Sequence, residues 1–292
     1  MLNCFIVIWF RIPTLLLLFN VEPLIEYMAV CEKAIRVGGD AIKQWAGKFD
    51  VSEKGPADLV TQADVASQQA ISRSIWEVFP DHSIIGEEDA GLPFNANAPL
   101  RRGESEYRWI IDPLDGTTNF VHGVPHYAVS LALERNGELL VGAVLNPVQN
   151  ECFTAMAGHG ARLNGRKIHA SNVTALSDAL GVVGFPPGVK QESPDLKIFL
   201  RAIFRCQSIH RSGSTALNLA YLAAGRYDIF WSFSSKIWDI AAGVLLLSEA
   251  GGALCTPEGN RYLFDQSPFL AAANPGLLSH LHIVATEALK KK

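Results

Sequence analysis

The stretch WIIDPLDGTTNF, residues 109–120, places the carboxylates of Asp112 and Asp115 three residues apart behind an apolar segment. The run 109–111 predicts a buried strand. Pro113 has no N–H group to donate to a sheet and biases the residue before it toward extended backbone, so we expect the strand to end at Asp112. The two acidic side chains would then leave the same strand end and point into one space.

This arrangement is typical of a site that binds both metal and phosphate. Mg²⁺ prefers oxygen ligands in near-octahedral geometry, and Asp112, Asp115 and the carbonyl of Leu114 could share one or two ions. A helix that starts directly afterwards would aim its free amides, those of Gly116, Thr117 and Thr118, at a bound phosphate. The alternative is a strand, turn and helix in which Asp115 only caps the helix.

Three further acidic segments could contribute to the same site. Residues 81–89 end a short apolar strand in three consecutive acids, Glu87, Glu88 and Asp89. Asp239 stands at the start of a predicted helix that ends at Gly251, and Asp64 stands near the start of an amphipathic helix. Taken singly, these segments predict a solvated acidic turn and two helix caps.

In this order the four segments resemble the inositol monophosphatase family, a group of Mg²⁺-dependent and often lithium-sensitive sugar-phosphate phosphatases. The resemblance runs from about residue 28 to the C-terminus. Residues 109–120 satisfy the family's first signature, and residues 238–243 with 249–252 satisfy the second. The resemblance implies an α+β sugar-phosphatase fold, a layered α-β-α-β-α sandwich with the metal site between its two halves.

Matched residue by residue, the resemblance implies a role for each motif. It implies that metal is bound by Glu87, Asp112, the carbonyl of Leu114, Asp115 and Asp239. It implies that Asp64 and Thr117 orient the attacking water, that the amides of Gly116 and Thr117 hold phosphate, and that Ser214, Thr215 and Ala216 contact the sugar. Lys54 falls in the family's mobile loop over the site. Two or three Mg²⁺ ions, lithium sensitivity and a homodimer are also implied.

The residues themselves support the same chemistry. A phosphate monoester dianion repels a nucleophile, so cations must neutralise its oxygens and hold a water in line with the leaving group; two ions about 4 Å apart can do so. No protein nucleophile is then needed. The five cysteines contain no C-x-x-C pair, which argues against a phosphocysteine route or a zinc site, and His122 and His126 are interpreted as loop or core residues.

Composition agrees with a compact enzyme. The 292 residues are 49% hydrophobic and 18% charged, and a net charge of −4 without a basic cluster, apart from residues 290–292, argues against nucleic-acid binding. Scattered cysteines favour a reducing compartment, so we expect a cytoplasmic protein. Residues 1–27 are apolar but interrupted by Arg11 and Pro13; we interpret them as an N-terminal extension, with a membrane anchor as the alternative.

Two halves, residues 28–170 and 171–292, are expected to form one cooperative unit. In the first half we expect helices at 29–46 and 62–79 and a meander of strands at 127–134, 139–146 and 151–156, with Asn-Gly turns at 136–137 and 164–165. In the second half we expect strands at 180–184 and 227–231, helices at 195–205, 214–224 and 239–250, and a final helix from about residue 275.

One position departs from the family pattern and bears on the substrate. Many relatives have a glutamate that bonds an inositol hydroxyl seven residues before the last metal-binding aspartate, and here that position is Ser232. We therefore expect an inositol-1-phosphate phosphatase-like enzyme of broad specificity. Histidinol phosphate, fructose 1,6-bisphosphate and 3′-phosphonucleotides are alternative substrates, and Lys236 could meet a second phosphate. A regulatory or RNA-associated binding protein that keeps the fold is the alternative from another class.

Overall fold

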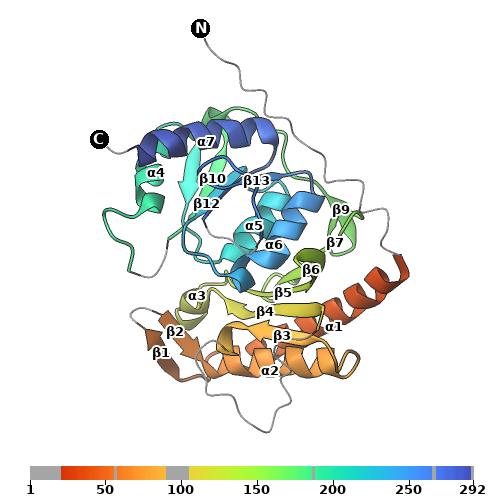
Figure 1. Ribbon diagram of the computed structural model, residues 1–292. Helices are drawn as coiled ribbons and strands as arrows, with labels where there is room; N and C mark the ends of the chain where they lie inside the picture. The colour runs from red at the N-terminus through yellow and green to blue at the C-terminus, as the bar shows by residue number, and fades with distance from the viewer. Residues whose placement is uncertain (1–20, 56–57, 90–104, 186–187, 265–267, 291–292) are drawn as a thin grey trace.

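The computed structural model describes residues 21–55, 58–89, 105–185, 188–264 and 268–290. Within these ranges the chain folds into five layers in which helices and sheets alternate (Figure 1). The predicted α-β-α-β-α sandwich is therefore confirmed. No helix in this part of the chain combines the length and the apolar character needed to cross a membrane. The expectations for residues 1–20 lie outside the described residues.

The first layer is a pair of helices, α1 (Val21–Trp45) and α2 (Gln62–Trp76). α1 begins at Val21 rather than at residue 29, so residues 21–27, which we assigned to the extension, belong to this helix. The reason is packing. Leu24 is buried, and the ring of Tyr27 lies 5.3 Å from the ring of Phe79, so these residues continue the helix face that meets the core.

The second layer is a seven-stranded sheet in the order β3-β4-β5-β6-β7-β8-β9. Its strands are β3 (Ser83–Gly86), β4 (Tyr107–Asp115), β5 (Ala128–Arg135), β6 (Glu138–Asn146), β7 (Glu151–Met156), β8 (Ala161–Leu163) and β9 (Arg166–Ile168). β3 and β4 run parallel and the other neighbours antiparallel. Asn136 and Gly137 both have positive φ, as the two-residue turn between β5 and β6 requires. The predicted meander is therefore confirmed.

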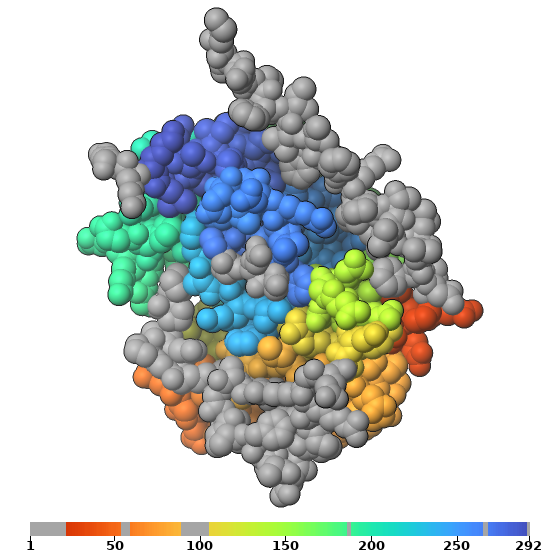
Figure 2. All heavy atoms as spheres, in the orientation of Figure 1, coloured from red at the N-terminus to blue at the C-terminus, as the bar shows by residue number. Residues whose placement is uncertain are grey.

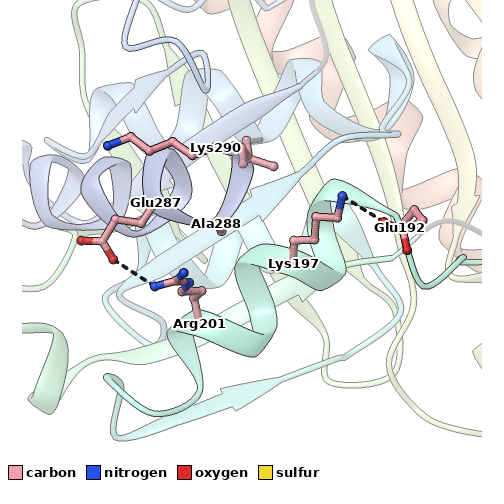
Figure 3. A pocket seen from close by; sticks show the side chains of 7 residues that line it. Glu192, Lys197, Arg201, Glu287, Ala288 and Lys290 are labelled. Carbon is pink, nitrogen blue, oxygen red and sulfur yellow. Dashed lines mark ion pairs between the residues drawn. The ribbon is translucent and has the colours of Figure 1, made fainter. Parts of the chain in front are cut away.

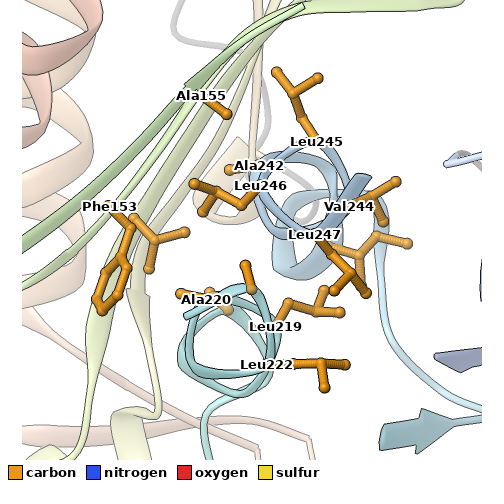
Figure 4. Close-up of a cluster of buried hydrophobic side chains, with 14 of the residues drawn as sticks. Phe153, Ala155, Leu219, Ala220, Leu222, Ala242, Val244, Leu245, Leu246 and Leu247 are labelled. Carbon is orange, nitrogen blue, oxygen red and sulfur yellow. The ribbon is translucent and has the colours of Figure 1, made fainter. Parts of the chain in front are cut away.

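The third layer consists of α5 (Thr215–Ala223) and α6 (Ile237–Glu249), which lie between the two sheets (Figure 4). Both helices are apolar on nearly every side because each meets protein on all faces. Glycines allow the close approach. A Cβ on Gly142 of β6 would lie 3.1 Å from the Cα of Ala242, and a Cβ on Gly243 would lie 2.4 Å from the Cβ of Leu219.

The far end of α6 is attached to the first sheet. The carboxylate of Glu249 accepts hydrogen bonds from the amides of Gly158 and Gly160, each at 2.7 Å, in the turn between β7 and β8. Because Asp239 lies in the first turn of the same helix, α6 connects this turn with the predicted site.

The fourth and fifth layers complete the sandwich. A five-stranded sheet has the order β11-β10-β12-β14-β13, with strands β10 (Leu180–Gly184), β11 (Ser208–His210), β12 (Ile229–Ser232), β13 (Ala253–Cys255) and β14 (Phe269–Ala272). Its outer face is covered by α4 (Pro194–Ala202) and α7 (Pro275–Leu289). The N-terminal and C-terminal parts lie directly against each other, as the adjoining yellow and blue surfaces in Figure 2 show.

A hairpin of β1 (Val51–Gly55) and β2 (Asp58–Thr61), which we did not predict, stands beside the first sheet and leads into α2. The hairpin contacts α3 (Thr117–Val121), and just before it the ring of Phe49 lies 4.8 Å from the ring of Phe120. It therefore lies close to the signature segment. The side chain of Lys54, expected in a loop over the site, lies outside the described residues.

Candidate active site

The signature segment leaves the sheet differently from our prediction. β4 does not end at Asp112 but runs through Pro113 to Asp115. Its pairing with β5 is regular as far as Asp112 and resumes at Asp115, with a shift of register between them. Such an irregularity accommodates a proline, which cannot donate a hydrogen bond to the ladder. The two carboxylates therefore lie on either side of a bulge at the end of β4.

Gly116 forms the junction between β4 and α3. Its φ is 98°, a conformation that favours glycine, and a Cβ there would lie 3.2 Å from the carbonyl oxygens of Gly213 and His126. The predicted helix start after Asp115 is therefore present, although α3 has only five residues. Phosphate binding by the amides of Gly116, Thr117 and Thr118 stays a prediction.

Asp64 and Thr117, the predicted catalytic pair, are in direct contact. Asp64 is fully buried; its Oδ2 accepts hydrogen bonds from the amide and the hydroxyl of Thr61, at 2.8 and 2.7 Å. Its Oδ1 accepts from the hydroxyl of Thr117 at 3.1 Å, and that hydroxyl also lies 3.0 Å from the carbonyl oxygen of Leu114. Asp64 is thus part of a helix capping box and, at the same time, a partner of Thr117.

Asp115 joins the first half of the chain to the second. Its Oδ2 accepts hydrogen bonds from the hydroxyl of Ser214 and the amide of Ala216, both at 2.6 Å, at the start of α5. Burial raises the pKa of Asp115 to about 6, although the bonds from Ser214 and Ala216 lower it. The segment predicted to contact the sugar, Ser214 to Ala216, therefore lies against a predicted metal ligand.

Asp112 and Asp239 reach the same region from β4 and α6. Asp112 is buried, and its Oδ1 accepts the amide of Leu114 at 3.1 Å. Asp239 is partly exposed, and its Oδ2 accepts the amide of Lys236 at 2.7 Å. Burial raises the pKa of both carboxyl groups well above the ordinary range; the charges of Glu87, Asp115 and Asp239 raise that of Asp112 further, and the charge of Asp115 raises that of Asp239.

The carboxylates that we predict to bind metal therefore lie near one another. Glu87, Asp112, Asp115 and Asp239 lie close enough for their charges to act on one another. In the described residues, however, no three acidic, histidine or cysteine side chains are grouped tightly enough to enclose an ion as they stand. The oxygens of Asp112, Asp115 and Asp239 accept protein amides. An all-oxygen set of mutually repelling carboxylates fits a hard divalent cation such as Mg²⁺.

Ser232, at the end of β12, is buried rather than open to the site. Its Oγ accepts the hydroxyl of Ser235 at 2.7 Å, and a Cβ on Gly184 would lie 3.3 Å from it. The segment that follows is held by Asp195, whose Oδ1 accepts the amide of Phe233 at 3.0 Å. The position at which many relatives have a glutamate is thus occupied by Ser232, which is hydrogen-bonded to Ser235.

A groove of about 620 Å³ lies elsewhere, between α4 and α7, and contains none of the predicted site residues. Four of its charged side chains form two ion pairs. Lys197 contacts Glu192 at 3.2 Å, and Arg201 contacts Glu287 at 3.6 Å (Figure 3). We do not assign it to the reaction.

Sequence reasoning missed one residue that organises the site. The side-chain amide of Asn119 donates to the carbonyl oxygens of His126 and Ser212, at 2.6 and 2.8 Å, and so connects α3 to the approach of α5. The signal was present, because Asn119 belongs to the quoted signature. One of its partners, however, is the backbone carbonyl of Ser212, which lies 93 residues further along the chain and which no local pattern identifies.

These features agree with a direct comparison. The family model for the inositol monophosphatase family matches residues 24–290, and the chain belongs to this family. The resemblance seen in the motifs is thereby confirmed.

Three relatives illustrate the range of names within the family. The chain is 40% identical to Nus factor SuhB of Pseudomonas aeruginosa over 245 residues, covering 82% of this chain and 88% of the relative. It is 42% identical to inositol-1-monophosphatase of Rhizobium meliloti over 212 residues, covering 72% and 77%. The crystal structure of extragenic suppressor protein SuhB from Bartonella henselae superposes with a TM-score of 0.82 at 35% identity, covering 90% of this chain and 99% of that one.

Proposed function

We propose that this chain is a Mg²⁺-dependent phosphomonoesterase that hydrolyses a small polyol or sugar phosphate, including inositol 1-phosphate. The observation that carries the proposal is the position of four carboxylates from three segments of the chain. Asp112 and Asp115 lie at the end of β4, Glu87 follows the neighbouring strand β3, and Asp239 lies in the first turn of α6, which packs against β4. Four carboxylates alone would repel a phosphate dianion, so binding requires cations among them. Membership of a phosphatase family supports the same reaction class.

The predicted ligands divide between side chains and backbone. Two or three Mg²⁺ ions would be held by Glu87, Asp112, the Leu114 carbonyl, Asp115 and Asp239. When bound, such ions neutralise phosphate oxygens and lower the pKa of a coordinated water. The amides that Asp112, Asp115 and Asp239 accept restrict where these carboxylates can lie.

Asp64 and Thr117 are the groups that would orient and deprotonate the water. The Thr117 hydroxyl donates toward Asp64 Oδ1, which leaves the lone pairs of its oxygen to accept a proton from water. As the water oxygen bonds to phosphorus and the P–O bond to the alcohol breaks, the proton of the water would pass to Thr117 and the proton of Thr117 to Asp64. The alkoxide that leaves would take its proton from a second water. Asp64 is fixed for this task by its two bonds from Thr61.

The part of the site that contacts the alcohol of the phosphate ester determines which substrate is accepted. The hydroxyl of Ser214 and the amide of Ala216 bind Asp115, so we assign direct contact with the sugar to the side chain of Thr215. Without a carboxylate at Ser232, inositol 1-phosphate should be accepted but not strongly preferred over other sugar phosphates. Histidinol phosphate, fructose 1,6-bisphosphate and 3′-phosphonucleotides are the alternatives. A homodimer, lithium sensitivity and a cytoplasmic location belong to the same proposal.

A phosphate-release screen tests the proposal. Purified protein is assayed against a panel of phosphomonoesters with Mg²⁺, with EDTA, and with EDTA followed by excess Mg²⁺. We expect turnover that EDTA abolishes and Mg²⁺ restores, and its loss in Asp112→Asn. Asp195→Asn is the matched control, since it changes another buried aspartate outside the site. Full turnover in metal-free buffer would contradict the proposal.

A regulatory role is the second candidate, because a relative at 40% identity is named a Nus factor. A chain that served only as a binding protein would have no use for the complete acidic set. The same preparation is therefore titrated with fluorescent single-stranded RNA. Binding of RNA without phosphate release from any ester would favour the regulatory role over catalysis.

A further inference from the structure

The helix α2 presents a polar face to the predicted metal site. Asp64, Ser67 and Gln68 lie at positions i, i+3 and i+4, which places them on one side of the helix. All three are buried, whereas buried positions of a helix that packs on a sheet are ordinarily apolar. The function proposed above uses only Asp64. The other two require an explanation.

Ser67 holds the peptide that orients Asp112. Its hydroxyl donates to the carbonyl oxygen of Pro113 at 2.9 Å. That carbonyl belongs to the same rigid peptide plane as the amide of Leu114, which donates to Asp112 Oδ1 at 3.1 Å. The hydroxyl of Ser67 therefore fixes one side of a peptide whose other side fixes a carboxylate. Its own position is restricted by α1, because a Cβ on Gly38 would lie 3.0 Å from the Ser67 oxygen.

Gln68 holds the peptide next to Glu87 in the same way. Its Oε1 accepts the amide of Glu88 at 3.1 Å, and this amide belongs to the peptide plane that follows Glu87. The side chain lies so close to the backbone that a Cβ on Gly86 would be 2.3 Å from Oε1. Gly86 is also the residue of β3 that pairs with Ile111 of β4, so Glu87 and Asp112 follow paired residues of two neighbouring parallel strands.

We propose that Ser67 and Gln68 are positioning residues that set the Mg²⁺ affinity of the site, by fixing on one helix the peptides next to Asp112 and Glu87. The proposal rests on the proposed function, since it presupposes that these carboxylates bind metal. Outer groups that orient metal ligands typically change metal affinity by tenfold to a hundredfold when they are removed. Ser67 and Gln68 themselves touch neither metal nor substrate. Their effect is therefore on where the ligands are held.

The test uses Ser67→Ala, which removes one hydroxyl, and Gln68→Met, which keeps the length of the side chain but removes its acceptor. Ser74→Ala is the matched control, because Ser74 is a buried serine of the same helix whose hydroxyl has no hydrogen-bond partner in the described structure. Mg²⁺ dissociation constants are measured by isothermal titration calorimetry without substrate. Thermal unfolding without metal reports stability, and kcat is measured at saturating Mg²⁺.

We expect the Mg²⁺ dissociation constant to rise at least tenfold in Ser67→Ala and in Gln68→Met and to stay unchanged in Ser74→Ala. kcat at saturating Mg²⁺ should remain within a fewfold of wild type. If both variants bind Mg²⁺ like wild type and only unfold at lower temperature, their role is structural and the proposal is wrong. If wild type itself binds no Mg²⁺, the proposed function fails first, which distinguishes the two failures.

Discussion

The buried carboxyl group of Asp195 gives a stability prediction whose sign can be worked out. Asp195 is 1% exposed, in the first turn of α4, and its Oδ1 accepts the amide of Phe233. Burial raises its pKa to about 6, partly offset by that amide. Because the folded pKa lies above the unfolded value of about 3.9, the native state binds the proton more tightly. This group therefore favours folding at low pH, and its contribution is lost as the pH rises from about 4 to above 6.

The magnitude follows from the shift. Two pKa units correspond to about 3 kcal/mol, and we expect about half of that because relaxation of the protein around a buried charge reduces the cost of burying it. Asparagine has no charge and keeps an oxygen that can accept the Phe233 amide. Asp195→Asn should therefore raise the free energy of unfolding by about 1–2 kcal/mol at pH 7.5 and by less than about 0.5 kcal/mol at pH 4.

Urea denaturation of wild type and variant at both pH values measures the difference, and taking the difference cancels the titration of the other carboxylates. Asp195→Leu is the control, since it removes charge and acceptor together and should cost about 1–3 kcal/mol by leaving the Phe233 amide unpaired. A stabilisation by Asp195→Asn that is equal at both pH values, or a loss of stability at pH 7.5, would refute the reasoning.

Four other outcomes are expected. Asp112→Asn should lower kcat by several orders of magnitude without lowering the melting temperature, because it removes a ligand and relieves charge repulsion; kinetics and calorimetry together check this. Lithium at millimolar concentration should reduce initial rates at fixed Mg²⁺, whereas unchanged rates would place the enzyme among insensitive relatives. Gly243→Ala should destabilise by about 1–3 kcal/mol, since its Cβ would meet Leu219, and an unchanged unfolding free energy would contradict this. Ser232→Glu should lower the free energy of unfolding by about 1–3 kcal/mol, because it places a charged side chain where Ser232 is buried against Ser235 and Gly184; a variant as stable as wild type would show this to be wrong.

The sequence predicted correctly those strands and turns that are determined by residues close together in the chain. The strand at 180–184 and the strand at 151–156 were predicted with the bounds that the structure has, because each is an apolar run between turn residues. The Asn136 and Gly137 turn followed from the positive φ that these residue types tolerate. The start of α1 and the passage of β4 through Pro113 were predicted wrongly, because packing against distant aromatic rings and pairing with β5 decide them.

The candidate site divides in the same way. The acidic residues could be identified from the sequence because burying several carboxylates among apolar residues costs free energy unless they bind a cation. The groups that hold them did not stand out. Ser67 and Gln68 look like ordinary polar residues of an amphipathic helix, and only the folded chain shows that they face Pro113 and Glu88 rather than water. Ser232 was identified only as the position at which many relatives have a glutamate, and its burial beside Ser235 depends on tertiary contacts.

The attachment of α6 to the first sheet through Glu249 has a mechanical consequence. Its 13 residues span about 20 Å, with Asp239 near one end and the Glu249 carboxylate bound to two glycine amides at the other. A helix held in this manner is restrained against sliding along its axis and against rotating about it. The placement of Asp239 is therefore set in part by the turn between β7 and β8, at the other end of the helix.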